Sequence, residues 1–279
     1  MKYAIADGKK TEATPRAKGL CQGCESELVP KCGNIKVWHW AHKAKTQCDR
    51  WWENETEWHR AWKEQFPDDW QEVVLLAESG EKHIADVKTD QGWVLEFQHS
   101  FLKPEERQAR EAFYPKLVWI VDGVKRKRDK FHFFNAWQKS IEVSAQAWLV
   151  RRVFSDECVL LREWADSRVP IFFDFGEGNV LWWLTKGSDG RVYIAQFQRD
   201  DFIKSHRDGA SQMSREFDEF VKDISKLVAD YEAPPQAQAS ISQPQPPPAQ
   251  VSISQPPQQP QWRPQDYLTN WARRQKRRL

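Results

Sequence analysis

The sequence predicts a mixed α and β protein, of the α+β or α/β class, followed by a disordered tail. Three features support this prediction. Over residues 51–135, the apolar residues follow helix-like and strand-like periods in the order helix, three strands, helix, strand. Cysteine and histidine residues are concentrated in residues 1–50. Residues 233–264 are rich in Pro, Gln and Ser, a composition that buries too little apolar surface to offset the chain entropy.

The composition is that of a globular protein of one or two domains. Of the 279 residues, 40% are hydrophobic, so a sizeable core is expected, and the net charge of +2 gives no overall signal for nucleic acid. No apolar segment approaches the ~20 residues that span a bilayer, so no membrane contact is expected. Residues 1–20 lack the apolar run of a signal peptide, which favours a cytoplasmic location with reduced cysteines.

The N-terminal module, residues 1–50, has the pattern of a structural zinc site. Zinc prefers four thiolate or imidazole ligands in a tetrahedron, and a two-residue gap lets one tight turn supply two of them. The candidate ligands with this spacing are Cys21, Cys24, His39 and His42. Cys48 could replace either histidine, and Cys32 is a weaker candidate. The alternative is a group of reduced cysteines without a metal.

Residues 55–63 are expected to form a helix. Glu55, His59 and Lys63 recur every four residues, so they would share one face of that helix. A strand over residues 73–77 follows it in the predicted order.

Residues 83–100 are expected to form a hairpin with its turn at residues 90–92. Strand side chains alternate between faces, so Trp93, Leu95 and Phe97 would point into a core, while Glu96 and Gln98 would share the opposite face. The hairpin could bring Asp86 of the first strand close to Glu96 of the second. Two converging carboxylates favour a hard divalent cation, which can activate water against a phosphodiester.

A second helix is expected over residues 104–113, with a buried strand over residues 116–121. Arg107 and Arg110 lie three residues apart and share a face of this helix. They could contact the phosphates of a nucleic acid. Pairing within the chain, with Glu106 or Glu111, is the alternative.

Asp86, Glu96 and Gln98 together resemble the motif of the PD-(D/E)xK nuclease superfamily, in which Gln98 stands where lysine is usual. The resemblance implies a restriction-endonuclease-like core with the element order αβββαβ over residues 51–135. It also implies that Glu55, Asp86 and Glu96 hold Mg²⁺ or Mn²⁺ while Gln98 orients the attacking water. His59 could assist proton transfer or be an ordinary polar helix residue.

Residues 21–123 more specifically resemble the competence protein CoiA family. The matching segments are the Cys21/Cys24 pair, His39-Trp-Ala-His42, the helix with Glu55 and His59, Ala85-Asp86-Val87, Glu96-Phe97-Gln98-x-Ser100, Glu106-Arg107 with Tyr114, and Val118–Gly123. The resemblance implies a metal-dependent nuclease that processes DNA during natural transformation or recombination. Two alternatives remain open: a catalytically inactive DNA-binding adaptor on the same fold, and a structural protein that binds other proteins.

Local basic clusters are the candidate contacts to DNA, with single-stranded and branched forms as candidate substrates. One cluster follows the predicted last core strand and consists of Lys125, Arg126, Lys127 and Arg128. A second lies in the C-terminal tail, residues 265–279, which could also dock on a partner protein. Such clusters gain affinity for phosphate backbones by releasing counterions, although a solvated loop and a frayed tail are the alternatives.

Residues 136–232 are expected to form a further α+β region. The pattern favours an amphipathic helix over residues 131–153, a hairpin over residues 171–184, a strand over residues 191–198 and a helix over residues 214–231. This region could be a second small domain or an extension of the preceding core. It contains no catalytic motif. An extended linker over residues 233–264 is expected to follow.

Overall fold

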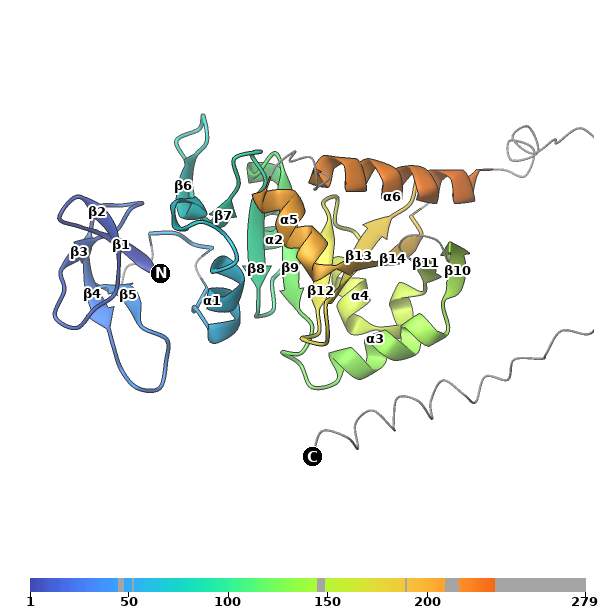
Figure 1. The fold of residues 1–279 in the computed structure, drawn as a ribbon, viewed down its shortest axis with the longest axis horizontal. Helices are drawn as coiled ribbons and strands as arrows, with labels where there is room; N and C mark the ends of the chain where they lie inside the picture. The colour runs from blue at the N-terminus through green and yellow to red at the C-terminus, as the bar shows by residue number, and fades with distance from the viewer. Residues whose placement is uncertain (45–47, 52, 145–148, 189, 209–215, 234–279) are drawn as a thin grey trace, which may run out of the picture. The chain divides into compact units, whose positions relative to one another are not determined.

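A computed structural model describes residues 1–44, 48–51, 53–144, 149–188, 190–208 and 216–233 (Figure 1). The chain divides into a compact unit, Met1–Gln238, and a second unit, Ala239–Leu279. The predicted basic tail and nearly all of the predicted linker lie outside the described residues.

The N-terminal residues form a five-stranded antiparallel sheet in the order β2-β1-β3-β4-β5. Its strands are β1 (Tyr3–Ala6), β2 (Lys9–Glu12), β3 (Gly19–Leu20), β4 (Glu27–Lys31) and β5 (His39–His42). Trp40 is fully buried in its core. A Cβ at Gly19 would lie 2.7 Å from the Cβ of Ala4, so the close approach of β3 to β1 requires glycine at this position.

The remaining strands form one nine-stranded mixed sheet in the order β10-β11-β14-β13-β12-β9-β8-β7-β6. They are β6 (Gln71–Leu76), β7 (Lys82–Lys88), β8 (Val94–Gln98), β9 (Leu117–Asp122), β10 (Ile141–Ser144), β11 (Val150–Val153), β12 (Ile171–Asp174), β13 (Val180–Lys186) and β14 (Val192–Gln198). The β8–β9 and β9–β12 pairs are parallel, and the other pairs are antiparallel.

Helices cover both faces of this sheet (Figure 1). They are α1 (Glu57–Lys63), α2 (Pro104–Phe113), α3 (Asp129–Gln138), α4 (Val159–Trp164), α5 (Arg199–Arg207) and α6 (Phe217–Glu232). Trp62 of α1 and Phe202 of α5 pack with α6 against one face, while Phe133 of α3 and Leu161 of α4 pack with residues of α2 against the other. The predicted mixed α and β class is confirmed.

The predicted hairpin is confirmed as β7 and β8. Gly92 adopts a φ of 81°, which glycine tolerates and which the turn between the strands requires. The predicted faces are also correct, because Leu95 and Phe97 join the core beneath α1 while Val94 joins the opposite core. Helices cover both faces here, so Glu96 is buried together with its neighbours on β8.

Helix α1 begins two residues later than predicted. The Thr56 side chain accepts a hydrogen bond from the His59 backbone N–H, and the His59 ring accepts one from the Thr56 N–H, which together form a capping box. Glu55 therefore precedes the helix and does not share a helix face with His59 and Lys63. The cap residue fixes this boundary, which the four-residue spacing alone does not indicate.

The predicted helix over residues 131–153 is corrected by the structure. Helix α3 ends at Gln138, and residues 141–144 and 150–153 form strands β10 and β11. Residues 145–148 of the predicted helix lie outside the described residues. The apolar residues of this segment fit both a helix and a strand pattern, and pairing of β11 with β14 favours the strand. The strands from β10 to β14 continue the same sheet as β6 to β9. No helix within the described ranges has the length and apolar character needed to cross a bilayer.

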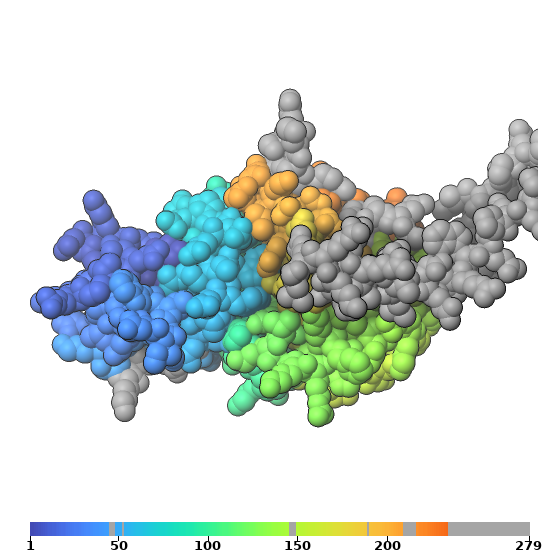
Figure 2. All heavy atoms as spheres, turned by 60° about the horizontal axis from the view of Figure 1, so that its bottom comes forward, coloured from blue at the N-terminus to red at the C-terminus, as the bar shows by residue number. Residues whose placement is uncertain are grey.

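The N-terminal sheet contacts the larger sheet through Glu72 of β6. Its carboxylate accepts hydrogen bonds from the backbone N–H groups of Lys2 at 2.6 Å and Tyr3 at 2.9 Å. In Figure 2, the atoms of the N-terminal sheet (blue) lie directly against those of α1 and β6 (light blue and cyan). This contact closes one side of the candidate site described next.

Candidate functional site

Four metal-binding side chains meet beside the N-terminal sheet. The ligand atoms of Cys21, Cys24, His42 and Cys48 all lie within 4.8 Å of one another. The Cys21 and Cys48 sulfurs are 3.5 Å apart, and Cys24 Sγ is 3.3 Å from His42 Nε2. A tetrahedron with Zn–S bonds of about 2.3 Å separates its ligands by about 3.8 Å, so this cluster could bind a structural metal such as zinc.

A tight turn prepares the first two ligands of this Cys/His cluster. The Glu25 N–H donates to the Cys21 carbonyl, and the Gly23 N–H donates to Cys21 Sγ at 3.4 Å. Burial opposes ionisation of Cys24, but hydrogen bonds from Ser26, His42 and Cys48 outweigh it and lower the pKa of the Cys24 thiol to about 6. The thiolate is the form that binds a metal.

The predicted ligand His39 is replaced in the cluster by Cys48, the alternative that the sequence left open. His39 and His42 lie three residues apart on β5, so their side chains point to opposite faces of the strand. The His42 ring reaches the cysteines, whereas His39 Nδ1 lies 2.9 Å from the Val37 carbonyl oxygen. The two-residue gap suits a turn but not a strand.

A cavity of about 240 Å³, here called the acidic pocket, lies between the N-terminal sheet, α1, β7 and β8. Its carboxylates are Asp49, Glu53, Glu55, Glu72, Asp86 and Glu96. Its basic side chains are His42, His59, Lys63 and Arg110. The predicted residues Glu55, His59, Asp86 and Glu96 therefore line one cavity.

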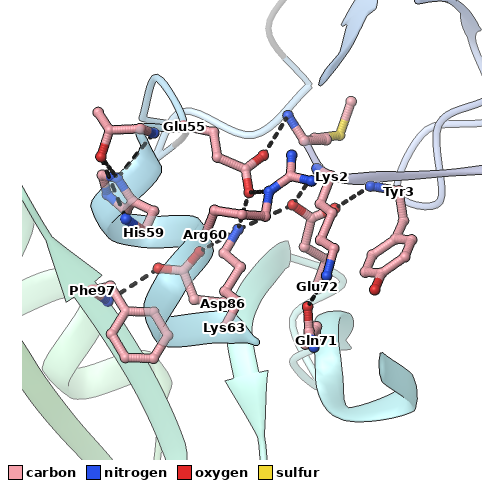
Figure 3. Close-up of polar contacts among 12 residues, drawn as sticks. Lys2, Tyr3, Glu55, His59, Arg60, Lys63, Gln71, Glu72, Asp86 and Phe97 are labelled. Atoms are coloured by element: carbon pink, nitrogen blue, oxygen red, sulfur yellow. Dashed lines mark hydrogen bonds and ion pairs between the residues drawn. The ribbon is translucent and has the colours of Figure 1, made fainter. Parts of the chain in front are cut away.

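Lys63 is the centre of the ion pairs in this pocket (Figure 3). Its Nζ lies 3.1 Å from Asp86 Oδ1, 3.1 Å from Glu72 Oε1 and 3.5 Å from Glu55 Oε1. Burial disfavours the charged form of Lys63, but the three carboxylates outweigh it and hold its pKa well above the ordinary value. The side chain is therefore an ammonium ion at every pH near neutrality.

Asp86 and Glu96 lie on neighbouring strands, and each carboxylate accepts a hydrogen bond from a backbone N–H group of the other strand. Asp86 Oδ2 accepts a hydrogen bond from the Phe97 N–H at 3.0 Å, and Glu96 Oε1 accepts one from the Asp86 N–H at 3.4 Å. Glu96 Oε2 also pairs with Arg110 at 3.1 Å. Burial first, and then the charge of Asp86, raise the pKa of Glu96 to about 8 in spite of Arg110. A bound cation would oppose both causes.

The hydrogen-bond partners of the Gln98 side chain are Glu53 and Ser100, and not Asp86 or Glu96. Its amide donates to Glu53 Oε2 at 3.1 Å and to the Ser100 carbonyl at 3.0 Å. Glu53 also lies 3.5 Å from His59 Nε2 and accepts a hydrogen bond from the Ser100 N–H at 2.6 Å. The sequence alone does not indicate Glu53, Glu72 or the central position of Lys63, because none of them belongs to a recognisable motif.

Buried polar atoms in this pocket have no hydrogen-bond partner in the described part of the chain. They are Glu55 Oε2, His59 Nε2 and Arg110 Nε. Glu55 Oε2 has only the Met1 ammonium at 3.9 Å, and His59 Nε2 has only Glu53 at 3.5 Å. Buried polar atoms are usually hydrogen-bonded, so three such atoms on residues that line one cavity favour a polar or ionic ligand there.

The predicted phosphate contacts Arg107 and Arg110 are buried on α2. Arg107 pairs with Glu111 and Asp166, and Arg110 pairs with Glu96 and Glu106. Burial favours the alternative of pairing within the chain. In the basic cluster that follows β9, Arg126 pairs with Glu163 and Asp129, whereas Lys125, Lys127 and Arg128 are exposed.

Comparison with known proteins concerns the N-terminal module. Residues 7–50 match the family described as competence protein CoiA, N-terminal domain. The match covers the Cys/His cluster and most of the N-terminal sheet. It suggests a competence-related role. Comparisons with curated proteins and with solved structures found no match.

Proposed function

We propose that this chain is a metal-dependent nuclease that acts on DNA and that the acidic pocket is its active site. The observation that carries the proposal is the position of Asp86 and Glu96, which come from adjacent strands and line one cavity together with Glu55. A divalent cation held by carboxylates in a small buried cavity is a common means of phosphodiester hydrolysis.

The arrangement of the neighbouring elements supports a PD-(D/E)xK-like core. Helix α1 precedes the antiparallel strands β6, β7 and β8, and α2 then connects β8 to the parallel strand β9. This is the αβββαβ order that the sequence predicts for residues 51–135. Asp86 lies on the middle one of the three antiparallel strands, and Glu96 lies on the third.

Asp86, Glu96 and Glu55 would hold Mg²⁺ or Mn²⁺ in this pocket. The bound cation would lower the pKa of a water molecule and neutralise charge on the scissile phosphate. The chain prepares the ligands itself, since the Phe97 N–H fixes one oxygen of Asp86 and Arg110 fixes one oxygen of Glu96. Glu55 Oε2 accepts no hydrogen bond and lies 3.9 Å from the Met1 ammonium, so it would be available to bind the same cation.

The N-terminal match to competence protein CoiA suggests the process in which such an activity would serve. The basic residues Lys125, Lys127 and Arg128, which are exposed, are proposed as contacts to the phosphate backbone.

The test uses the full-length protein with single-stranded, double-stranded and branched DNA, in Mg²⁺, Mn²⁺ or EDTA. The expected result is cleavage that requires a divalent cation and that falls by about 100-fold or more in Asp86→Asn and Glu96→Gln. Glu105→Gln is the matched control, because Glu105 is exposed on α2 away from the pocket lining. Equal cutting by wild type and both pocket variants would refute the proposal.

A catalytically inactive DNA-binding adaptor is the second candidate. It is favoured by the pairing of Asp86 with Lys63 and of Glu96 with Arg110, because these cations already neutralise the carboxylates. The same assay distinguishes the candidates. An adaptor would bind DNA with a salt-dependent affinity and leave it intact in every metal.

A further inference from the structure

We propose that Lys63 of α1 supplies the positive charge that the motif Glu96-x-Gln98 lacks, and that its ammonium group is a catalytic group of the acidic pocket. This inference rests on the proposed nuclease function and adds a residue to it. It follows from a juxtaposition of elements that are distant in the sequence. Lys63 lies in the last turn of α1, and its Nζ is 3.1 Å from Asp86 Oδ1 on β7.

Gln98 cannot provide this charge. Its side chain is neutral. Its amide group is bonded to Glu53 and to the Ser100 carbonyl. Lys63, in contrast, lines the same cavity as Asp86 and Glu96.

The ion pairs around Lys63 allow it to remain in place when Asp86 binds a cation. Glu72 lies 3.1 Å from Lys63 Nζ and Glu55 lies 3.5 Å from it, so the ammonium keeps a counterion if Asp86 turns toward a metal. Glu72 is itself fixed by the backbone N–H groups of Lys2 and Tyr3. The ammonium group is thus preorganised in a buried site, where a charge acts more strongly than in water.

The chemical step is a hydrolysis in which Lys63 stays protonated. The oxygen of a water molecule forms a bond to phosphorus, and one P–O ester bond breaks. A pocket carboxylate takes the proton of the attacking water, and the leaving oxygen takes a proton from another water molecule. The extra negative charge on the non-bridging oxygens is what the Lys63 ammonium stabilises, as a compact point charge within the cavity.

The test compares wild type, Lys63→Gln, Lys63→Arg and the double variant Lys63→Gln/Gln98→Lys. Single-turnover cleavage of DNA is measured at saturating Mn²⁺, and Mn²⁺ affinity is measured separately by calorimetry. Lys63→Gln is expected to cut about 100- to 1,000-fold more slowly while it still binds Mn²⁺, because the ammonium no longer competes for the carboxylates. The double variant, which returns a lysine to the usual position, is expected to recover about tenfold or more of that loss.

Lys63→Arg keeps the charge, and with it the buried ion pairs, if Lys63→Gln does not fold. Its longer planar group is expected to cut about tenfold or more slowly than lysine. Wild-type cleavage rates in Lys63→Gln or Lys63→Arg would overturn the proposed role of Lys63 and leave the nuclease proposal standing. A second result would also overturn the proposed role of Lys63. In this result, folded Lys63→Gln loses both Mn²⁺ binding and cleavage, and the double variant recovers neither. The lysine would then only shape the pocket. No cleavage by wild type in any metal would overturn the nuclease proposal itself.

Discussion

The Asp86 carboxylate accepts a hydrogen bond from the backbone N–H of Phe97, with 3.0 Å between Oδ2 and the nitrogen. The regular ladder between β7 and β8 pairs Val87 with Leu95 and Lys88 with Val94. Toward the other end of this strand pair, the Asp86 side chain provides an acceptor for the neighbouring strand. Asp86 therefore orders the hairpin as well as lining the acidic pocket.

Asp86→Ala is expected to lower the free energy of unfolding by about 1–3 kcal/mol, because the Phe97 N–H loses a buried acceptor. Asp86→Asn keeps an oxygen at the same place, so it is expected to lose less than half as much. Urea denaturation followed by tryptophan fluorescence measures both values. Equal destabilisation by the two variants would show that the Asp86 charge, and not its hydrogen bond to Phe97, stabilises the fold.

The Cys/His cluster predicts a sharp difference between two histidines of the same strand. His42→Ala is expected to reduce bound zinc strongly, whereas His39→Ala is expected to retain about one zinc ion per chain, because only His42 lies in the cluster. Elemental analysis of purified proteins measures this content. A chelator should lower the melting temperature of wild type and of His39→Ala. Equal zinc loss in both variants would refute the ligand set.

Stability is expected to fall in weak acid because of His206 on α5. This ring is fully buried against Phe202 and Phe217, and burial lowers its pKa to about 4 although Nδ1 bonds to the Phe202 carbonyl. Below pH ~6.5 His206 binds a proton in the unfolded chain, whereas in the folded chain it binds one only below pH ~4. The free energy of unfolding should therefore decrease by about 3 kcal/mol as the pH falls through this window.

Urea denaturation at several pH values between 4 and 7 measures the dependence. His206→Gln serves as the comparison, because it can still donate to the Phe202 carbonyl and has no titration in this range. The slope of stability against pH should be shallower in the variant. Identical slopes would mean that other groups, and not His206, cause the acid sensitivity.

Gly123, which follows β9, lies very close to the Phe175 ring in the core. A Cβ at this position would lie 2.4 Å and 2.6 Å from ring atoms of Phe175. Gly123→Ala is therefore expected to destabilise the protein by about 1–3 kcal/mol through overpacking. Gly33→Ala is the matched control, since a Cβ there meets nothing within 4 Å, and it should change stability by less than about 0.5 kcal/mol. Thermal melting of the two variants distinguishes these outcomes.

Sequence periodicity was most reliable where one face of an element is apolar. The alternation in residues 93–98 correctly assigned Leu95 and Phe97 to one side of β8 and Glu96 to the other. Periodicity was wrong for residues 141–144 and 150–153, where apolar residues fit both a helix and a strand. Pairing with β14, which lies about 40 residues further along the chain, decided the strand.

For the candidate site, the sequence identified residue types that suit a metal but not all of their partners. Alternation along β5 is a signal that could have separated His39 from His42. No comparable local signal identifies Glu72, whose contact with Lys63 depends on how β6 packs against α1.

The sequence by itself determined the hairpin, the Cys21–Cys24 turn and the acidic residues Asp86 and Glu96, because each follows from spacing within a few neighbouring residues. The tertiary structure alone decided that Cys48 completes the cluster and that Lys63 meets Asp86. Cys48 lies more than 20 positions from Cys21 and Cys24, as Lys63 does from Asp86. The distances between these residues are set by the packing of sheets and helices, which local patterns do not encode.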